Sequence, residues 1–424
     1  MQRGVNPIGG ADASARRFAV LQPGARLHYA VPAVLARAGR LARLYTDAHA
    51  RSALPFRLLE LAPRGSLPGP LARLAGRRLP PELEPLTISL PWATLAELLA
   101  RKLRTGGGLV SVPGTEARLR RTALARNFDG AGGLYVLSNG DLDLVREAKR
   151  RGLFVAYEQI INPHVGRILR EERARHPDLE PQDTEAEVEE GLRRDEEVWR
   201  LADVVLGASG HVRGEILEHG VSAEKVRVVP YGIGAGWLEL APRPVPGRVL
   251  FVGSVGLRKG VHVLAAASRE LRRRGVQHEL RVVGPIELAA ARAAWSKRLA
   301  SPEFESVTYL GQVPRAEVRA EFAQADIFVL PTLSDSFALV HLEAMACGVP
   351  VVTTPSCGST VRDGLDGFIV GTRDAIGLAD RIEALISDRA LRERCSRNAR
   401  ARASEFTWDS YAQRLLGAVS QDAF

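Results

Sequence analysis

The stretch ADIFVLPTLSDSFALVHLEAMACGVPVVTTP, residues 325–355, decides the fold. It opens with an apolar run, Ile327–Leu330, which ends at Pro331 and leads into a polar loop. A helix-like segment follows at 339–347, and a second apolar run occupies 349–353. Continuous apolar strands between amphipathic helices are typical of parallel strands that are buried on both faces. The stretch therefore predicts a strand–helix–strand unit of a doubly wound α/β sheet.

The same alternation extends towards the N-terminus from this stretch. We expect further strands at 226–229, 248–252, 279–283 and 307–310, and further helices at 260–274, 288–299 and 315–323. Several of these strands end in Gly or Pro, and the carboxyl ends of such strands are where doubly wound sheets bind ligands. The second half of the chain therefore predicts one complete Rossmann-like domain.

The first half repeats the scheme less clearly. We expect strands at 18–21, 44–46, 134–137, 154–157 and 204–206, a long helix at 27–39 and a charged helical region at 168–200. Residues 52–92 are rich in Pro, Leu and Arg and permit no assignment. The segment APRPVPG, 241–247, is typical of a semi-rigid linker. We therefore predict one domain at 1–240 and a second at 241–405, followed by a terminal helix at 406–424.

Composition narrows the class of protein. The 424 residues are enough for two domains, and no apolar run approaches the 18 residues of a membrane-spanning helix. Three cysteines without a CxxC pair fit a reducing cytoplasm and argue against a disulfide framework or a Cys-rich zinc site. The nine histidines form no HExxH motif. We expect a cytoplasmic protein without a metal.

The charge is uneven along the chain. Residues 1–126 hold 20 Lys and Arg against 7 Asp and Glu, which gives +13, whereas the whole chain carries +9. One reading is solvated, arginine-rich helix faces, and the other is a surface that meets an anionic partner such as a membrane. No nucleic-acid-binding signature accompanies the arginines, so we expect no nucleic acid partner.

Two loops carry the chemistry. Ser336, Phe337, Ala338 and Leu339 stand where a helix begins, and backbone N–H groups at a helix N-terminus bind phosphate. Asp335 precedes them and Glu343 follows eight residues later, so that both carboxylates border one ligand.

The second loop, GSVGLRKG at 253–260, joins a predicted strand to a predicted helix. It places two adjacent cations, Arg258 and Lys259, at the start of that helix. This arrangement suits a diphosphate.

Together these loops resemble the donor-site signature of retaining glycosyltransferases that have the two-Rossmann-domain (GT-B) fold, of the glycosyltransferase family 4 (group 1) type. That signature has an acidic residue, seven further residues and a Glu. The matching residues are Leu342, Glu343, Ala344, Met345, Ala346, Gly348, Pro350, Val351 and Val352, with Lys259 on the lysine of the other loop. Four positions depart from it: Asp335 replaces Glu, Ser336 and Ala338 replace Gly, and Ser254 replaces Arg.

The resemblance implies two Rossmann-like domains facing across a cleft, with the terminal helix packed back on the first domain. It implies that Arg258, Lys259 and the helix terminus stabilise the leaving diphosphate, that Glu343 binds the ribose, and that Asp335 lies near the transferred sugar. It also implies that no cofactor or metal takes part. The remaining donor-binding residues that it implies are Gly24, Gly253, Ser254, Gly284, Val313, Ser336, Phe337, Ala338 and Leu339.

The acceptor half leaves alternatives open. Gly24 is either a plain turn glycine or a contact that faces the donor. Glu158 stands near the position where the family often has a His, and it is either a substituted polar contact or a surface residue. Asp141 and Asp143 spell a DxD pattern, which we interpret as helix-capping acids rather than a metal site.

We therefore expect a retaining glycosyltransferase that moves a sugar from a nucleotide-diphosphate sugar to an acceptor hydroxyl. The acceptor would be a glycan, a lipid-linked molecule or a small molecule, and the protein would lie in the cytoplasm or on the inner face of the membrane. Two alternatives remain: a catalytically inactive relative that binds sugar nucleotides, and a nucleotide-sugar epimerase with the same architecture.

Overall fold

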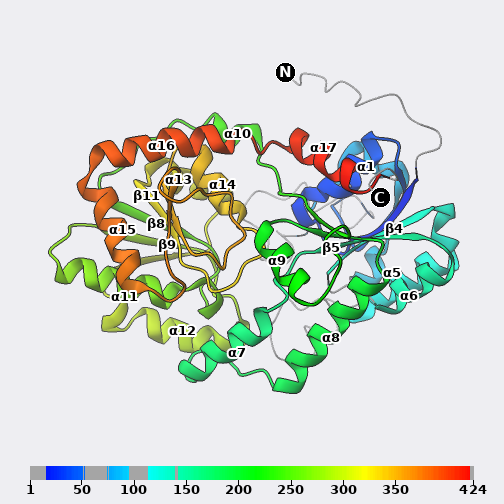
Figure 1. Cartoon of the computed structure of the whole chain (residues 1–424), viewed down its shortest axis with the longest axis horizontal. Coiled ribbons are helices and arrows are strands. Elements are labelled where there is room, and N and C mark those ends of the chain that lie inside the picture. The colour runs from blue at the N-terminus through cyan, green and yellow to red at the C-terminus, as the bar shows by residue number, and fades with distance from the viewer. Residues whose placement is uncertain are drawn as a thin grey trace.

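A computed structural model describes residues 16–50, 52, 74, 76–94, 113–138 and 142–420. Two parallel sheets make up its two halves, and helices flank each sheet (Figure 1). This arrangement confirms the predicted pair of doubly wound α/β units. Among the described residues, no helix is both long enough and apolar enough to span a membrane.

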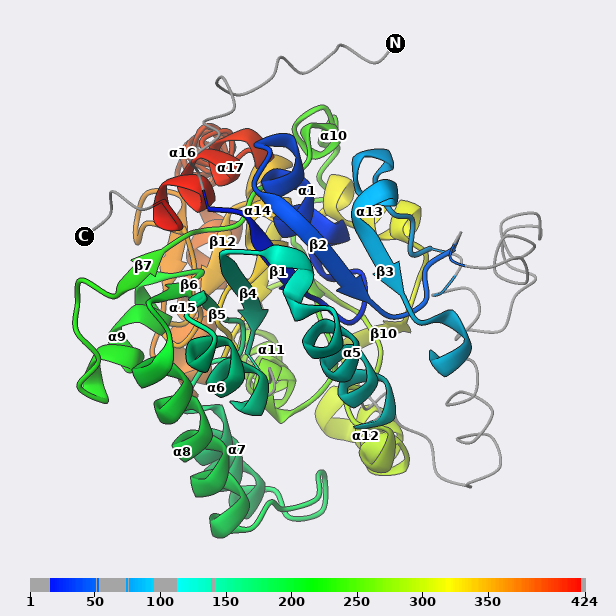
Figure 2. The ribbon, with the colours of Figure 1, turned by 90° about the vertical axis from the view of Figure 1, so that its right-hand side faces the viewer.

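The first sheet has seven strands in the order β3-β2-β1-β4-β5-β6-β7 (Figure 2). Its strands are β1 Phe18–Leu21, β2 Leu41–Thr46, β3 Thr87–Ser89, β4 Gly133–Leu137, β5 Phe154–Gln159, β6 Val204–Gly207 and β7 Val226–Val228. The helices of this half are α1 Ala30–Arg37, α5 Pro113–Ala125, α6 Leu142–Arg150, α7 Val165–Arg175, α8 Glu185–Leu201 and α9 Gly210–Glu218.

The second sheet has six strands in the order β10-β9-β8-β11-β12-β13. Its strands are β8 Arg248–Val252, β9 Glu279–Val283, β10 Val307–Gly311, β11 Ile327–Leu330, β12 Val351–Thr353 and β13 Gly367–Ile369. The helices are α10 Ala235–Leu238, α11 Val261–Arg273, α12 Arg292–Leu299, α13 Arg315–Gln324, α14 Leu339–Ala346, α15 Ala375–Ser387, α16 Arg389–Ala403 and α17 Trp408–Ala418. The order reverses direction at β8 and β11, which is where such sheets bind ligands.

Two predicted helices differ from the observed ones. The helix expected at 27–39 begins only at Ala30, because Leu27, His28 and Tyr29 all have left-handed φ angles between 48° and 62°. Non-glycine residues rarely adopt that region, and their sequence gives no sign of it. The charged region at 168–200 is two helices, α7 and α8, separated by residues 176–184. Most of 52–92, Asp141 and residues 421–424 lie outside the described residues.

The chain passes between the two halves at two neighbouring points. The first follows β7, and the second precedes α17, which packs on α1 of the first half. The Ile233 amide donates to the Phe406 carbonyl over 2.7 Å. A side chain at Gly232 would lie 2.7 Å from the Thr407 backbone, so only glycine lets the two segments approach this closely.

Candidate functional site

The cations predicted for the second loop lie at the carboxyl end of β8, in the short helix Leu257–Lys259. The Lys259 ammonium pairs with the Asp335 carboxylate, which comes from the loop after β11. Arg258 Nε donates to Glu287 Oε1 over 2.8 Å, and its NH1 group donates to the Ser334 carbonyl over 3.2 Å. The structure therefore brings both predicted cations and the first predicted carboxylate together.

Two glycines let the strand ends meet. Gly260 has φ +70°, and a Cβ there would lie 1.9 Å from the Pro331 carbonyl oxygen. Gly284 has φ +143°, and a Cβ there would lie 1.9 Å from the Gly253 carbonyl oxygen. No L side chain fits either position. The ends of β8, β9 and β11 therefore close on one another through glycine, and predicted residues Gly253 and Gly284 contact each other directly.

The loop at 334–338 is fixed by a neighbouring loop at 356–358. The Asp335 amide donates to the Ser356 carbonyl over 3.0 Å, and the Gly358 amide donates back to the Asp335 carbonyl over 2.9 Å. The Ala338 amide donates to the Gly358 carbonyl over 3.2 Å. Of the four amides from Ser336 to Leu339 that are predicted donors to a ligand, that of Ala338 is therefore engaged within the protein.

The helix that follows this loop, α14, starts where the sequence predicted it. The helix begins at Leu339, so Ser336 and Phe337 belong to the loop rather than to the helix. In the described part of the chain, the amides of Ser336, Phe337 and Leu339 have no hydrogen-bond partner. These three amides are the backbone donors that this loop can offer to an anion.

The Lys259–Asp335 pair is largely buried, with side-chain exposures of 12% and 14%. Burial raises the pKa of Asp335, but the charges of Lys259 and Arg258 outweigh it and hold the pKa below its usual value. Asp335 is therefore an ionised carboxylate. Burial lowers the pKa of the neighbouring His341 to about 3, so this imidazole is neutral at physiological pH.

Glu343 lies on α14, one turn beyond the start of the helix. Its carboxylate accepts a hydrogen bond from Arg315 NH2 over 2.9 Å, and its side chain is 12% exposed. Burial raises the pKa of Glu343, although Arg315 and Arg319 partly oppose that rise. Glu343 is thus a shielded hydrogen-bonding group on the helix that follows Asp335.

The first half contacts the 334–338 loop directly. Ser336 Oγ donates to the Ile160 carbonyl over 2.6 Å, and Ser209 Oγ donates to the Ser336 carbonyl over 2.8 Å. Nearby, the buried Glu180 carboxylate accepts from the Leu257 amide over 2.8 Å. The predicted site therefore lies where the two halves of the molecule meet.

The acceptor-side residues are placed less centrally. The Gly24 amide donates to Asp47 Oδ1 over 2.9 Å, within the first half. Glu158 is buried and accepts hydrogen bonds from the hydroxyls of Tyr135 (2.5 Å) and Tyr231 (2.6 Å), so its surface alternative is wrong. Asp143 lies in the first turn of α6, where an acidic side chain complements the helix dipole, and it pairs with Arg146.

The remaining predicted residues lie around the same strand ends. Val313 follows β10 and is partly buried against the core, and Ser254 follows Gly253 after β8. Four residues at the site were not predicted, because each comes from a distant segment that matches no motif. They are Glu180, Ser209, Glu287 and Arg315.

Comparison with known proteins finds a family model that matches part of the second half. Residues 246–388 match the family model described as glycosyl transferases group 1. The chain is 32% identical over 227 residues to a glycogen synthase of Mycobacterium tuberculosis, a match covering 51% of this chain and 54% of that protein. It is 31% identical over 241 residues to a D-inositol 3-phosphate glycosyltransferase of Pseudarthrobacter chlorophenolicus, covering 53% and 57% respectively. The chain thus spans about half the length of the curated relatives that it matches.

Solved structures match the whole fold. A sucrose-phosphate synthase from Thermosynechococcus elongatus superposes with a TM-score of 0.65 at 20% identity, covering 94% of this chain and 97% of that one. HepE of Anabaena in complex with UDP-glucose superposes with a TM-score of 0.62 at 16% identity, covering 95% and 99%. At these identities the likeness shows the fold alone, which is the two-Rossmann-domain fold. This chain therefore has the two-Rossmann-domain (GT-B) fold, and its residues 246–388 match the group 1 glycosyltransferase family model.

Proposed function

We propose that this protein is a retaining glycosyltransferase that moves a sugar from a nucleotide-diphosphate sugar to an acceptor hydroxyl. The observation that carries the proposal is the buried Lys259–Asp335 pair, with Arg258 beside it, at the strand ends of a group 1 glycosyltransferase domain. Further support comes from relatives named as glycosyltransferases and from HepE, whose structures were determined with UDP and with UDP-glucose.

The proposed mechanism is electrostatic. Arg258, Lys259 and the open amides near Leu339 neutralise the charge that develops on the departing diphosphate. Asp335 lies beside these cations, where it orients the sugar, and Glu343 accepts hydrogen bonds from the ribose. The acceptor hydroxyl attacks the anomeric carbon from the face of the leaving group as the bond to the diphosphate breaks, and its proton passes to a phosphate oxygen of the departing diphosphate. Attack from this face retains the anomeric configuration. No metal is needed for these roles.

The acceptor side is proposed to lie on the first half. A cavity of about 550 Å³ there is lined by the loop after β5, including Ile161 and His164, and by α8, including Asp195. Ile161 directly follows Ile160, whose carbonyl accepts the hydrogen bond from Ser336. The cavity lining is thus one residue along the chain from a direct contact with the 334–338 loop, and its mixed polar and apolar character suits an amphipathic acceptor.

We also propose that the acceptor is lipid-linked or part of the cell envelope, and that the protein binds the inner face of the membrane. The support is the charge of +13 on residues 1–126. Co-sedimentation with vesicles tests this. We expect binding to vesicles with anionic lipid that weakens as salt rises, and equal recovery with neutral vesicles would contradict the proposal.

A thermal-shift screen of nucleotide sugars tests the transferase proposal itself. A ligand at 100 times its dissociation constant stabilises the folded state by about 2.7 kcal/mol, so the correct donor gives a clear shift. NMR of the product made from that donor and candidate acceptors then reports the anomeric configuration. Stabilisation without transfer to any acceptor would favour an inactive sugar-nucleotide binder, and conversion of the donor without an acceptor would favour an epimerase.

A further inference from the structure

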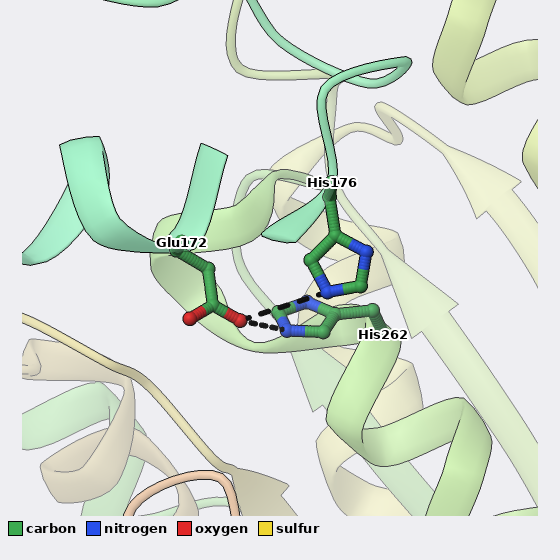
Figure 3. A group of neighbouring side chains, drawn as sticks. All are labelled: Glu172, His176 and His262. Atoms are coloured by element: carbon green, nitrogen blue, oxygen red, sulfur yellow. Dashed lines mark hydrogen bonds and ion pairs between the residues drawn. The ribbon is translucent and has the colours of Figure 1, made fainter. Parts of the chain in front are cut away.

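Three metal-ligating side chains meet between the two halves of the molecule (Figure 3). Glu172 and His176 lie four residues apart at the end of α7, and His262 lies in the first turn of α11. The spacing of four places Glu172 and His176 on one side of the helix end. The potential ligand atoms of Glu172, His176 and His262 all lie within 4.8 Å of one another.

Arginines orient the Glu172 carboxylate. Arg373 Nε and Arg175 NH1 both donate to Oε2, over 2.5 Å and 3.0 Å. The other oxygen, Oε1, faces the imidazoles and lies 2.8 Å from His262 Nε2 and 3.7 Å from His176 Nε2. The cluster therefore presents one carboxylate oxygen and two imidazoles as potential ligands. The hydrogen bonds from the two arginines to the other carboxylate oxygen fix the orientation of the carboxylate.

His262 is nearly buried and faces Glu172 with one ring nitrogen. Its side chain is 10% exposed, and its buried Nδ1 has no hydrogen-bond partner among the described residues. A buried ring nitrogen without a partner costs free energy unless another group satisfies it. The nitrogen that faces Glu172 is Nε2, so Nε2 is the candidate ligand atom, and the unpartnered Nδ1 is a separate feature of this ring.

We propose that Glu172, His176 and His262 bind a divalent cation of the zinc class, which ties α7 to α11. Zn²⁺ takes two imidazoles and a carboxylate at about 2.0–2.2 Å, so tetrahedral ligand atoms lie about 3.4 Å apart. The two separations that involve the Glu172 oxygen, 2.8 Å and 3.7 Å, bracket that value, and all three ligand atoms lie within 4.8 Å of one another. His176 is a quarter exposed, which leaves room for a water as the fourth ligand.

This ion has a structural role. Glu172 and His176 come from the first half and His262 from the second, so the bound ion links them by coordination rather than by ion pairs alone. The sequence analysis expected no metal, because the three residues span 90 positions and match no metal-binding motif. The proposal does not rest on the proposed transferase activity.

Titration of the full-length, chelator-treated protein with Zn²⁺ against a competing chromogenic chelator tests the site. We expect one ion per chain with a dissociation constant in the micromolar range or below. His262→Ala and His176→Ala should each weaken binding at least tenfold. His211→Ala is the matched control, because His211 has the same 25% side-chain exposure as His176 and lies outside the cluster.

Thermal unfolding gives a second readout. Zn²⁺ should raise the midpoint of the wild type and of the His211→Ala variant, and raise that of His176→Ala clearly less at the same Zn²⁺ concentration. If His262→Ala fails to fold, the quarter-exposed His176 variant still decides the question. Absence of saturable Zn²⁺ binding below about 100 μM, or equal loss of binding in the control variant, would overturn the proposal.

Discussion

Replacing Lys259 by Ala is the sharpest test of the proposed site, because Lys259 forms a buried ion pair and is also proposed to bind the diphosphate. Its ammonium pairs with Asp335 in surroundings where both side chains are nearly nine-tenths buried. Removing one partner of a buried ion pair typically costs about 3–5 kcal/mol. Arg258 also stabilises the Asp335 charge, so we expect the lower end, about 3 kcal/mol.

The effect on turnover is separate from this loss of stability. A cation that stabilises the leaving diphosphate acts like one preorganised oxyanion donor, whose loss lowers turnover by about 10²–10³-fold. The double variant Lys259→Ala/Asp335→Asn has no unpaired buried charge. It should regain most of the stability measured by urea denaturation while remaining inactive.

The assay is steady-state release of nucleoside diphosphate with the donor found by thermal shift, corrected for the folded fraction. Lys297→Ala is the matched control, because Lys297 is exposed on α12 of the same domain, and its turnover should stay within about twofold of wild type. A Lys259→Ala turnover within about threefold of wild type would refute the phosphate role.

Three further variants test the surrounding structure. Gly260→Ala should lower the free energy of unfolding, measured by urea denaturation, by about 2 kcal/mol or more. The reason is that φ at this residue is +70° and the added Cβ would meet the Pro331 carbonyl, and wild-type stability would contradict this prediction. A hydrogen bond from Arg126 lowers the pKa of Asp129 from 3.8 to about 2, so this carboxylate stabilises the fold above about pH 3.8 and loses that effect as the pH falls towards 2. Asp129→Asn should therefore reduce the fall in the free energy of unfolding between pH 3.8 and about pH 2, and an unchanged fall would contradict the lowered pKa of Asp129. Ser209→Ala removes the hydroxyl that donates to the 334–338 loop and should cost about 1 kcal/mol by the same denaturation, with no measurable change as the contrary result.

The second half of the fold was predictable because its strands are continuous apolar runs. The strands at 248–252, 279–283 and 327–330 have the predicted bounds to the residue. The first half was less predictable, because its turns depend on local strain. Leu27, His28 and Tyr29 adopt left-handed backbone angles that only the surrounding tertiary structure can impose.

The site was predictable as far as its motifs reached. Lys259 and Asp335 are 76 residues apart, yet both follow strands of one parallel sheet, and the ends of such strands meet at one edge. Glu287 and Glu180 were not predictable, since each approaches its partner only through long-range packing. The Glu172–His262 contact was hidden for the same reason.

The two chain crossings, at Gly232 and at Thr407, act together as one hinge made of two adjacent segments. Because the Ile233 amide donates a hydrogen bond to the Phe406 carbonyl, neither segment can slide along the other without breaking that bond. Two hydrogen-bonded segments side by side bend together more easily than they twist. We therefore expect any relative rotation of the two Rossmann units to occur as a hinge motion about a single axis through this point.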